Sequence, residues 1–163
     1  DHLWEIGLRR VAFVGGPESS AVSAEREQAF VRRVAELGMI LCGREGGREY
    51  SHQSGFDGTR AVMASRPEAI LYATDRLAIG GLDALSWSGG LSVPGDVSIV
   101  GFDNIDMACW PGIQLTTVHH DVPRIVDGAI ELLQQIQNGR EGPRKHLVKG
   151  GLVVRATTGP AKA

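Results

Sequence analysis

The stretch Val93-Pro94-Gly95-Asp96-Val97-Ser98-Ile99-Val100-Gly101-Phe102-Asp103-Asn104 gives the strongest indication of the fold. Its Pro-Gly-Asp turn leads into an apolar run that ends in glycine, an aromatic residue and the polar pair Asp103-Asn104. This order predicts a buried strand with polar groups at its carboxyl end. Open α/β sheets bind ligands beyond the carboxyl ends of their strands, so Asp103 stands where a small molecule would be hydrogen-bonded. On the residues alone, a cap on the next segment explains Asp103 about equally well.

Short apolar runs alternate with segments of helical period along the first two thirds of the chain. The runs are Val11–Val14, Met39–Cys42, Ala69–Tyr72 and Val97–Val100. Each is nearly continuous in apolar character, which is typical of strands covered on both faces. Between the runs, apolar residues share one helical stripe, as Phe30, Val34 and Leu37 do. This alternation implies parallel pairing through right-handed crossovers, so the predicted fold class is α/β with a doubly wound parallel sheet.

The pattern changes after Asn104. Leu115–Val118 is a β-prone run, and Asp121 is expected to cap a long helix that ends at Asn138-Gly139. Residues 143–149 and 152–155 are expected to be closing strands or extended segments. The long helix has a wide apolar face, and burying one Leu or Ile side chain contributes about 1.5–3 kcal/mol. We therefore expect this face to pack on the rest of the chain or on a neighbouring molecule, or the helix to be disordered.

Composition limits the classes of protein. With 163 residues and 42% hydrophobic content, the chain can bury a core. The formal net charge is −2 and the basic residues are scattered, so this chain is not expected to hold DNA itself. Cys42 and Cys109 are far apart and form no CxxC pair, which fits a reducing cytoplasm. No apolar run approaches the roughly 18 residues of a membrane span, so no membrane partner is expected.

Motifs in a fixed order run along nearly the whole chain. They are His2-Leu3, Arg9–Pro17, Arg26-x-x-Ala29-Phe30, Ser54–Phe56, Asp75-x-x-Ala78-Ile79-Gly80, Val93–Asn104, Leu115–Val118 and Leu152–Arg155. Their order and spacing resemble the effector-binding domain of lactose-repressor-type (LacI/GalR family) bacterial transcription regulators. The resemblance implies a type I periplasmic-binding-protein-like fold, in which two α/β lobes grip a small effector, often a sugar or a nucleobase.

The resemblance also implies how the chain is divided. Residues 1–114 would form most of the carboxyl-terminal lobe, 115–142 a strand and a helix of the other lobe, and 143–163 the return to the first lobe and a tail. Most of the amino-terminal lobe and a helix-turn-helix headpiece would precede this chain. The intact protein would then be a homodimer that binds operator DNA only through that headpiece. With one wall of the cleft present, this chain alone is expected to bind sugar weakly or not at all.

The resemblance marks Arg26 and Asp103 as candidate effector-binding residues. Arg26 matches a ligand-binding arginine of the family, and a guanidinium can offer a bidentate fork to hydroxyls or a carboxylate. Asp103 is the strongest candidate, because an acceptor-only carboxylate can bind two hydroxyls of one polyol ring. Without the resemblance, a solvated helix residue is the better interpretation of Arg26.

Tyr50, Thr74 and His120 complete the candidate effector site. Tyr50 follows the Gly-rich segment 43–49, and an aromatic ring in a loop at the mouth of a cleft can stack on a sugar, or can be exposed without function. Thr74 stands where the family usually has asparagine. The threonine side chain is shorter and lacks the amide's paired donor and acceptor, so the identity of the effector stays open. His120 matches a polar contact at the crossover between the lobes.

The remaining candidate residues serve structure or assembly. Ile79 and Leu82 lie on a helix that resembles the family's dimer-interface element, and Trp110 would add apolar surface to it, or these residues belong to the core. Asp75 is expected to cap that helix, and Arg155 is expected to form a structural ion pair. His119 and His120 would point to opposite faces of an extended segment, so no metal site is expected, and no cofactor.

We predict the effector-sensing portion of a cytoplasmic LacI-type regulator. An enzyme is not expected, since the chain lacks the Gly-x-Gly-x-x-Gly, Walker, Gly-x-Ser-x-Gly and His-Glu-x-x-His motifs, and Pro17 removes a backbone donor that a phosphate loop would need. The main alternative is a periplasmic sugar-binding protein of a transporter. An upstream export signal would support that alternative, whereas an upstream helix-turn-helix would exclude it.

Overall fold

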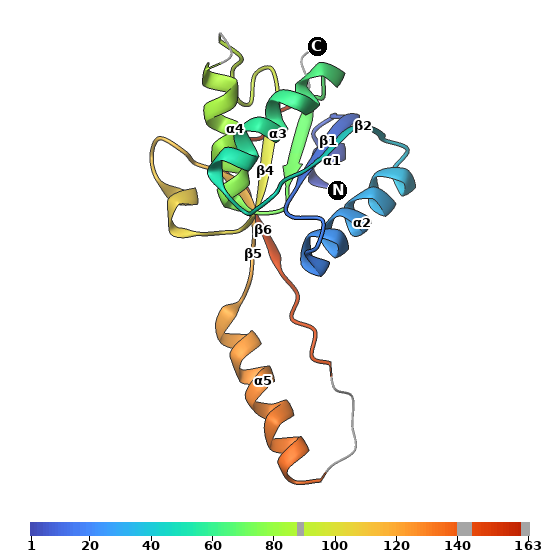
Figure 1. The fold of residues 1–163 in the computed structure, drawn as a ribbon, viewed down its shortest axis with the longest axis vertical. Helices are drawn as coiled ribbons and strands as arrows, with labels where there is room; N and C mark the ends of the chain where they lie inside the picture. The colour runs from blue at the N-terminus through green and yellow to red at the C-terminus, as the bar shows by residue number, and fades with distance from the viewer. Residues whose placement is uncertain (88–89, 140–144, 161–163) are drawn as a thin grey trace.

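The computed structural model describes residues 1–87, 90–139 and 145–160. They form a sheet of six strands in the order β2-β1-β3-β4-β5-β6, with helices packed beside it and one helix projecting from it (Figure 1). The strands are β1 (Arg10–Gly15), β2 (Ile40–Gly46), β3 (Ala69–Tyr72), β4 (Ser98–Asp103), β5 (Thr116–His119) and β6 (Gly151–Val153). The helices are α1 (His2–Glu5), α2 (Ala21–Glu36), α3 (His52–Val62), α4 (Asp75–Trp87) and α5 (Val122–Gln137), with short 3-10 turns at Met63–Ser65 and Asp106–Cys109.

The predicted parallel α/β sheet is confirmed. β1 pairs in parallel with both β2 and β3, β3 pairs with β4, and β4 pairs with β5, while β6 is antiparallel to β5. The second strand is longer than expected, because residues 43–46, interpreted as part of a Gly-rich loop, continue β2 alongside β1. Backbone pairing with a buried neighbour therefore overrides the local glycine signal.

Two hydrophobic clusters cover the sheet, and successive residues of β3 pack in different ones. Ala69 packs in a cluster with Leu3 of α1 and Val34 of α2, whereas Ile70 packs in a cluster with Val62 of α3 and Leu77 of α4. Because successive strand side chains point to opposite faces, the two clusters lie on opposite sides of the sheet. The continuous apolar runs thus follow from a sheet covered on both faces.

The strand that we assigned to the other lobe belongs to this sheet. β5 pairs with β4 from Val100 opposite Thr116 to Asp103 opposite His119, and Thr116 is fully buried. The chain therefore leaves this sheet only after His119, and the division of the chain between two lobes stays a prediction. Of the expected closing segments, 152–155 overlaps β6, residues 145–149 are not a strand, and 143–144 lie outside the described residues.

Helix α5 projects from the carboxyl edge of the sheet without a covering layer (Figure 1). It begins where predicted, because the Asp121 side chain accepts from the Arg124 N–H at 3.2 Å. Most of its apolar side chains are exposed, including Ile125 at 45% and Leu133 at 60%. The expectation that this face packs on the rest of the chain is wrong for the described residues, since α1 to α4 already cover both faces of the sheet. No helix within the described ranges is long and apolar enough to cross a membrane.

Candidate effector-binding site

The carboxyl edge of the sheet brings together residues that are far apart in sequence. From β1 the chain moves outward to β2 and then returns to β3 on the other side of β1, so β1 and β3 flank a topological switch point. In open α/β sheets this is the usual place for a ligand. The candidate residues follow the strands at this edge.

Arg26, Asp103 and His120 meet at the switch point. The Arg26 guanidinium donates through Nη1 to the Ala73 carbonyl after β3 and through Nη2 to Asp103 Oδ1 at 3.2 Å. His120 Nε2 lies 3.4 Å from the same Oδ1. The side chains are 19%, 31% and 32% exposed for Arg26, Asp103 and His120, so the carboxylate is not sealed in the interior. The Arg26 guanidinium, which we expected to offer a fork to a ligand, thus bonds the Ala73 carbonyl and the Asp103 carboxylate within the protein.

Phe102 forms the apolar side of this cluster. The Arg26 guanidinium carbon lies 3.9 Å from the centroid of the Phe102 ring, and the rings of Phe102 and His120 are 4.9 Å apart. Such cation–π contacts stabilise a guanidinium above a ring face. Sequence reasoning missed Phe102 as a site residue, although an aromatic residue immediately before the candidate carboxylate was a signal for it.

The backbone after β4 turns through two positive-φ residues. The φ angles are 115° at Asp103 and 55° at Asn104, a conformation that costs residues other than glycine free energy. The Asn104 side chain accepts from Arg155 Nη2 at 2.8 Å and lies 3.2 Å from His119 Nδ1. Arg155 also donates to the Leu115 carbonyl, so its partners among the described residues are neutral groups and not the expected ion pair. Sequence reasoning also missed the role of Asn104.

Thr74, and not Asp75 as expected, caps helix α4. Thr74 stands before α4, and its Oγ1 accepts from the Leu77 N–H at 3.4 Å, so the threonine is the helix cap. Asp75 is completely buried and reaches instead to the hydroxyl of Thr117 and the N–H of Ile105. Burial raises the pKa of the Asp75 carboxyl above its ordinary value, and the nearby charge of Asp103 adds to this, while the hydrogen bonds oppose it.

Tyr50 packs on the loop after β1 and is not free. Its hydroxyl lies 2.7 Å from Ser20 Oγ, and its ring leaves no room for a side chain at Gly16, where a Cβ would stand 2.1 Å from the ring. The described contacts do not join Tyr50 to the Arg26 and Asp103 cluster. A cavity of about 360 Å³ opens beside the ends of β1 and β2, lined by Gly16, Glu27 and Arg44 among others, but not by Asp103.

The two adjacent histidines turn to different partners, His119 to Asn104 and His120 to Asp103. Within the described residues, no cluster of three or more His, Cys, Asp or Glu side chains could hold a metal ion.

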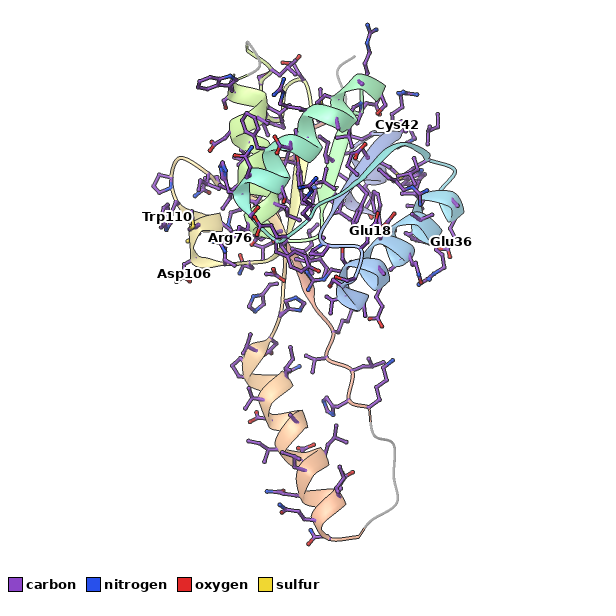
Figure 2. All side chains as sticks on the ribbon, in the orientation of Figure 1. Glu18, Glu36, Cys42, Arg76, Asp106 and Trp110 are labelled. Carbon is purple, nitrogen blue, oxygen red and sulfur yellow. The ribbon has the colours of Figure 1, made fainter. Side chains whose placement is uncertain are left out.

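The candidate dimer residues lie on and beside α4. Ile79 is 9% exposed and Leu82 is half-buried, and both line a groove of about 660 Å³ with the segment from Pro111 to Gln114. Trp110 is 51% exposed and lies at the outer edge of the lobe, next to the 3-10 turn that begins at Asp106 (Figure 2). Trp110 thus lies at the surface, whereas Ile79 is almost fully buried.

The fold and the position of the site define a class of protein. Residues 1–158 match the family described as periplasmic binding protein-like domain, and the chain belongs to this family. The predicted class is therefore confirmed.

The curated relatives that the chain matches are transcriptional repressors. The chain is 31% identical to the transcriptional repressor PurR of Vibrio vulnificus over 165 residues, covering 96% of this chain and 48% of the relative. It is 27% identical to the repressor CytR of Escherichia coli K12, covering 97% and 47%. The chain thus spans about half the length of the curated relatives it matches.

Solved structures agree with these relatives. A dimeric Lac repressor with an 11-residue C-terminal deletion superposes with a TM-score of 0.89 at 28% identity, covering 99% of this chain and 59% of that one. A LacI regulator from a Rhodococcus species gives a TM-score of 0.88 at 30% identity, covering 98% and 59%. These likenesses confirm the resemblance to LacI-family regulators.

Proposed function

We propose that this chain is the effector-sensing portion of a LacI-type transcriptional regulator that works in the cytoplasm, and that its effector is a sugar. The effector would contact Arg26, Tyr50, Thr74, Asp103 and His120. The observation that carries the proposal is the partly exposed Asp103 carboxylate at the switch point, held between Arg26 and His120. The repressor relatives favour a regulator over the binding protein of a transporter.

The chemistry of the edge suits a neutral polyol. Both described contacts of the Asp103 carboxylate use Oδ1, so its second oxygen can accept from ligand hydroxyls. Phe102 offers an apolar ring beside it, as sugar-binding sites commonly do.

The exposed apolar face of α5 supports the proposal that the longer protein has a second lobe. In the longer protein we propose that α5 packs against a lobe outside this chain and that the effector lies in the gap between the lobes. Effector binding would then favour one arrangement of the lobes by its difference in affinity for the two states. Operator DNA would be bound through a helix-turn-helix headpiece outside this chain, which fits the net charge of −2.

A homodimer completes the proposal. The α4 surface with Ile79, Leu82 and the neighbouring Trp110 would face the same surface of a second copy. One similar structure is described as the Lac repressor dimer bound to operator and the anti-inducer ONPF. An isologous interface of this kind is the commonest form of dimer.

The test uses the complete gene product that carries this chain. Calorimetric titration with glucose, galactose, ribose, lactose, maltose and hypoxanthine is expected to show binding of one sugar, and that sugar should change the affinity for operator DNA. Asp103→Asn should weaken sugar binding about tenfold or more, because a charge-assisted hydrogen bond contributes about 1.5 kcal/mol or more. Asp106→Asn, three residues further along and exposed, is the matched control and should bind as the wild type does.

The outcomes separate the alternatives. Binding of hypoxanthine alone would leave the proposal of a regulator in place, but would show that its effector is a nucleobase and not a sugar. Sugar binding by a protein with no affinity for DNA would support a transporter's binding protein. Equal affinities of Asp103→Asn and the wild type would remove Asp103 from the site.

A further inference from the structure

We infer that Asp75 is a positioning residue. It holds the turn that carries Asp103 in the conformation in which Asp103 can bind the effector. This inference rests on the proposed function for its consequence, ligand affinity. Its structural part, the control of the turn, stands independently and can be tested without a ligand.

The Asp75 carboxylate lies under the turn and joins it to two other elements. Asp75 is the first residue of α4 and has no exposed surface. Its Oδ2 accepts from the N–H of Ile105 at 2.9 Å, and its Oδ1 accepts from the hydroxyl of Thr117 on β5. The carboxylate can take this place only because residue 101 is glycine, since a Cβ there would stand 2.2 Å from Oδ1.

The same hydrogen bonds hold the strained part of the backbone. Thr117 Oγ1 donates to Asp75 and also accepts from the Asn104 N–H at 3.3 Å. The two amides that follow Asp103 are thus tied, directly or through Thr117, to one buried carboxylate. A backbone with positive φ at two successive residues other than glycine persists only where its surroundings fix it.

The consequence reaches the candidate ligand-binding atom. With the turn fixed, Oδ1 of Asp103 stays on Arg26 and His120, which leaves its second oxygen to accept from ligand hydroxyls, while Asp75 itself lies below the surface. If Asp75 is removed, the N–H of Ile105 loses its acceptor and the turn can relax to ordinary dihedral angles. Displacing a binding group by about 1 Å is enough to lose most of its contribution.

The first experiment measures the turn in the 163-residue chain by NMR. Asp75→Ala and Thr117→Val are expected to shift the amide resonances of Asn104 and Ile105 and to speed their hydrogen exchange well beyond the change in global stability. Thr117→Ser, which keeps the hydroxyl, should restore the wild-type behaviour. Asp83→Ala removes an exposed carboxylate from the same helix, one that bonds only to His52 in the described contacts, and is the matched control.

Each result decides the inference. If Asp75→Ala does not fold, Thr117→Val provides the answer, because it breaks the same chain of hydrogen bonds while keeping the shape of the side chain. Wild-type amide shifts and exchange at Asn104 and Ile105 in a folded Thr117→Val or Asp75→Ala variant would overturn the control of the turn.

The second experiment measures affinity in the complete gene product, using the sugar that binds the wild type most tightly in the panel above. Asp75→Ala and Thr117→Val should weaken binding about tenfold or more, whereas Thr117→Ser and Asp83→Ala should not. Altered turn resonances with unchanged sugar affinity would overturn the positioning role. If the wild type binds no sugar of the panel, the proposed sugar function fails, while the NMR result still decides whether Asp75 controls the turn.

Discussion

Arg26 shows how a single side chain at this edge serves the protein before any ligand is present. Its guanidinium bonds the carbonyl after β3 and the carboxylate after β4, and it also covers the Phe102 ring. A ligand that binds Asp103 therefore meets a carboxylate whose orientation is already set. Preorganisation of this kind reduces the entropy that binding must overcome.

Asp75 makes a pH-dependent contribution that can be measured. Its folded pKa is raised above the ordinary 3.8 by burial, so the folded state holds the proton more tightly than the unfolded state. The stability that this group contributes is therefore greatest below pH 3.8 and is lost as the pH rises through the folded pKa. Asp75→Asn cannot ionise, so the unfolding free energy of the wild type minus that of Asp75→Asn should fall as the pH rises.

Urea unfolding of both proteins between acid and neutral pH provides the measurement. Asp83→Asn, on the exposed side of the same helix, is the control. A difference that stays constant or grows as the pH rises would contradict the assignment of a raised pKa to Asp75.

At the scale of elements, the crossing of α3 and α4 depends on glycines that allow the two backbones to touch. A Cβ at Gly55 would stand 2.0 Å from the Leu77 carbonyl oxygen, and one at Gly80 would stand 2.0 Å from the His52 carbonyl oxygen. Both obstacles are backbone atoms, so neither can move aside as a flexible side chain would. This crossing seats α4, and with it Thr74 and Asp75, under the candidate site.

Gly80→Ala tests the crossing. Helix propensity alone favours alanine by about 1 kcal/mol, whereas the steric overlap should cost about 1–3 kcal/mol or more. We expect a net loss of stability in thermal or urea unfolding. Gly112→Ala, where a Cβ would meet nothing within 4 Å, should stay within about 0.5 kcal/mol of the wild type. A stabilised Gly80→Ala variant would show that the helices do not approach so closely.

At the scale of the whole molecule, the described residues form one sheet with α1 to α4 packed on it, and helix α5 lies outside this packing. The side chains of α5 extend into open space on most sides of the helix (Figure 2). One contact from the return segment reaches Gly128, which lies against the ring of His146. Helical periodicity therefore predicted α5 correctly but not its surroundings.

Two leucine variants measure the difference in packing between α5 and the helices that cover the sheet. Leu133 on α5 is 60% exposed, whereas Leu85 on α4 is 1% exposed. In the 163-residue chain, Leu133→Ala should change the unfolding free energy by less than about 0.5 kcal/mol, and Leu85→Ala should cost about 2–5 kcal/mol. In the complete gene product, Leu133→Ala should become costly as well, because the proposed second lobe would bury that side chain. Equal losses for both variants in the shorter chain would show that α5 is packed there.

The sequence by itself determined the elements and their class. Continuous apolar runs predicted the first four strands, and the motif order led to the family and to Arg26, Asp103 and His120, which do meet in space. Local composition can determine the strands and helices because their periods reflect burial on one or two faces, whereas the candidate residues came from the resemblance to the family.

Only the tertiary structure decided which atoms meet. It placed β5 beside β4, made Thr74 the cap of α4 in place of Asp75, added Phe102 to the cluster and left α5 uncovered. The physical reason is that pairing partners and hydrogen-bond acceptors are chosen between segments distant in the chain. Asp75 reaches Thr117 across 42 positions, a contact that no local pattern encodes.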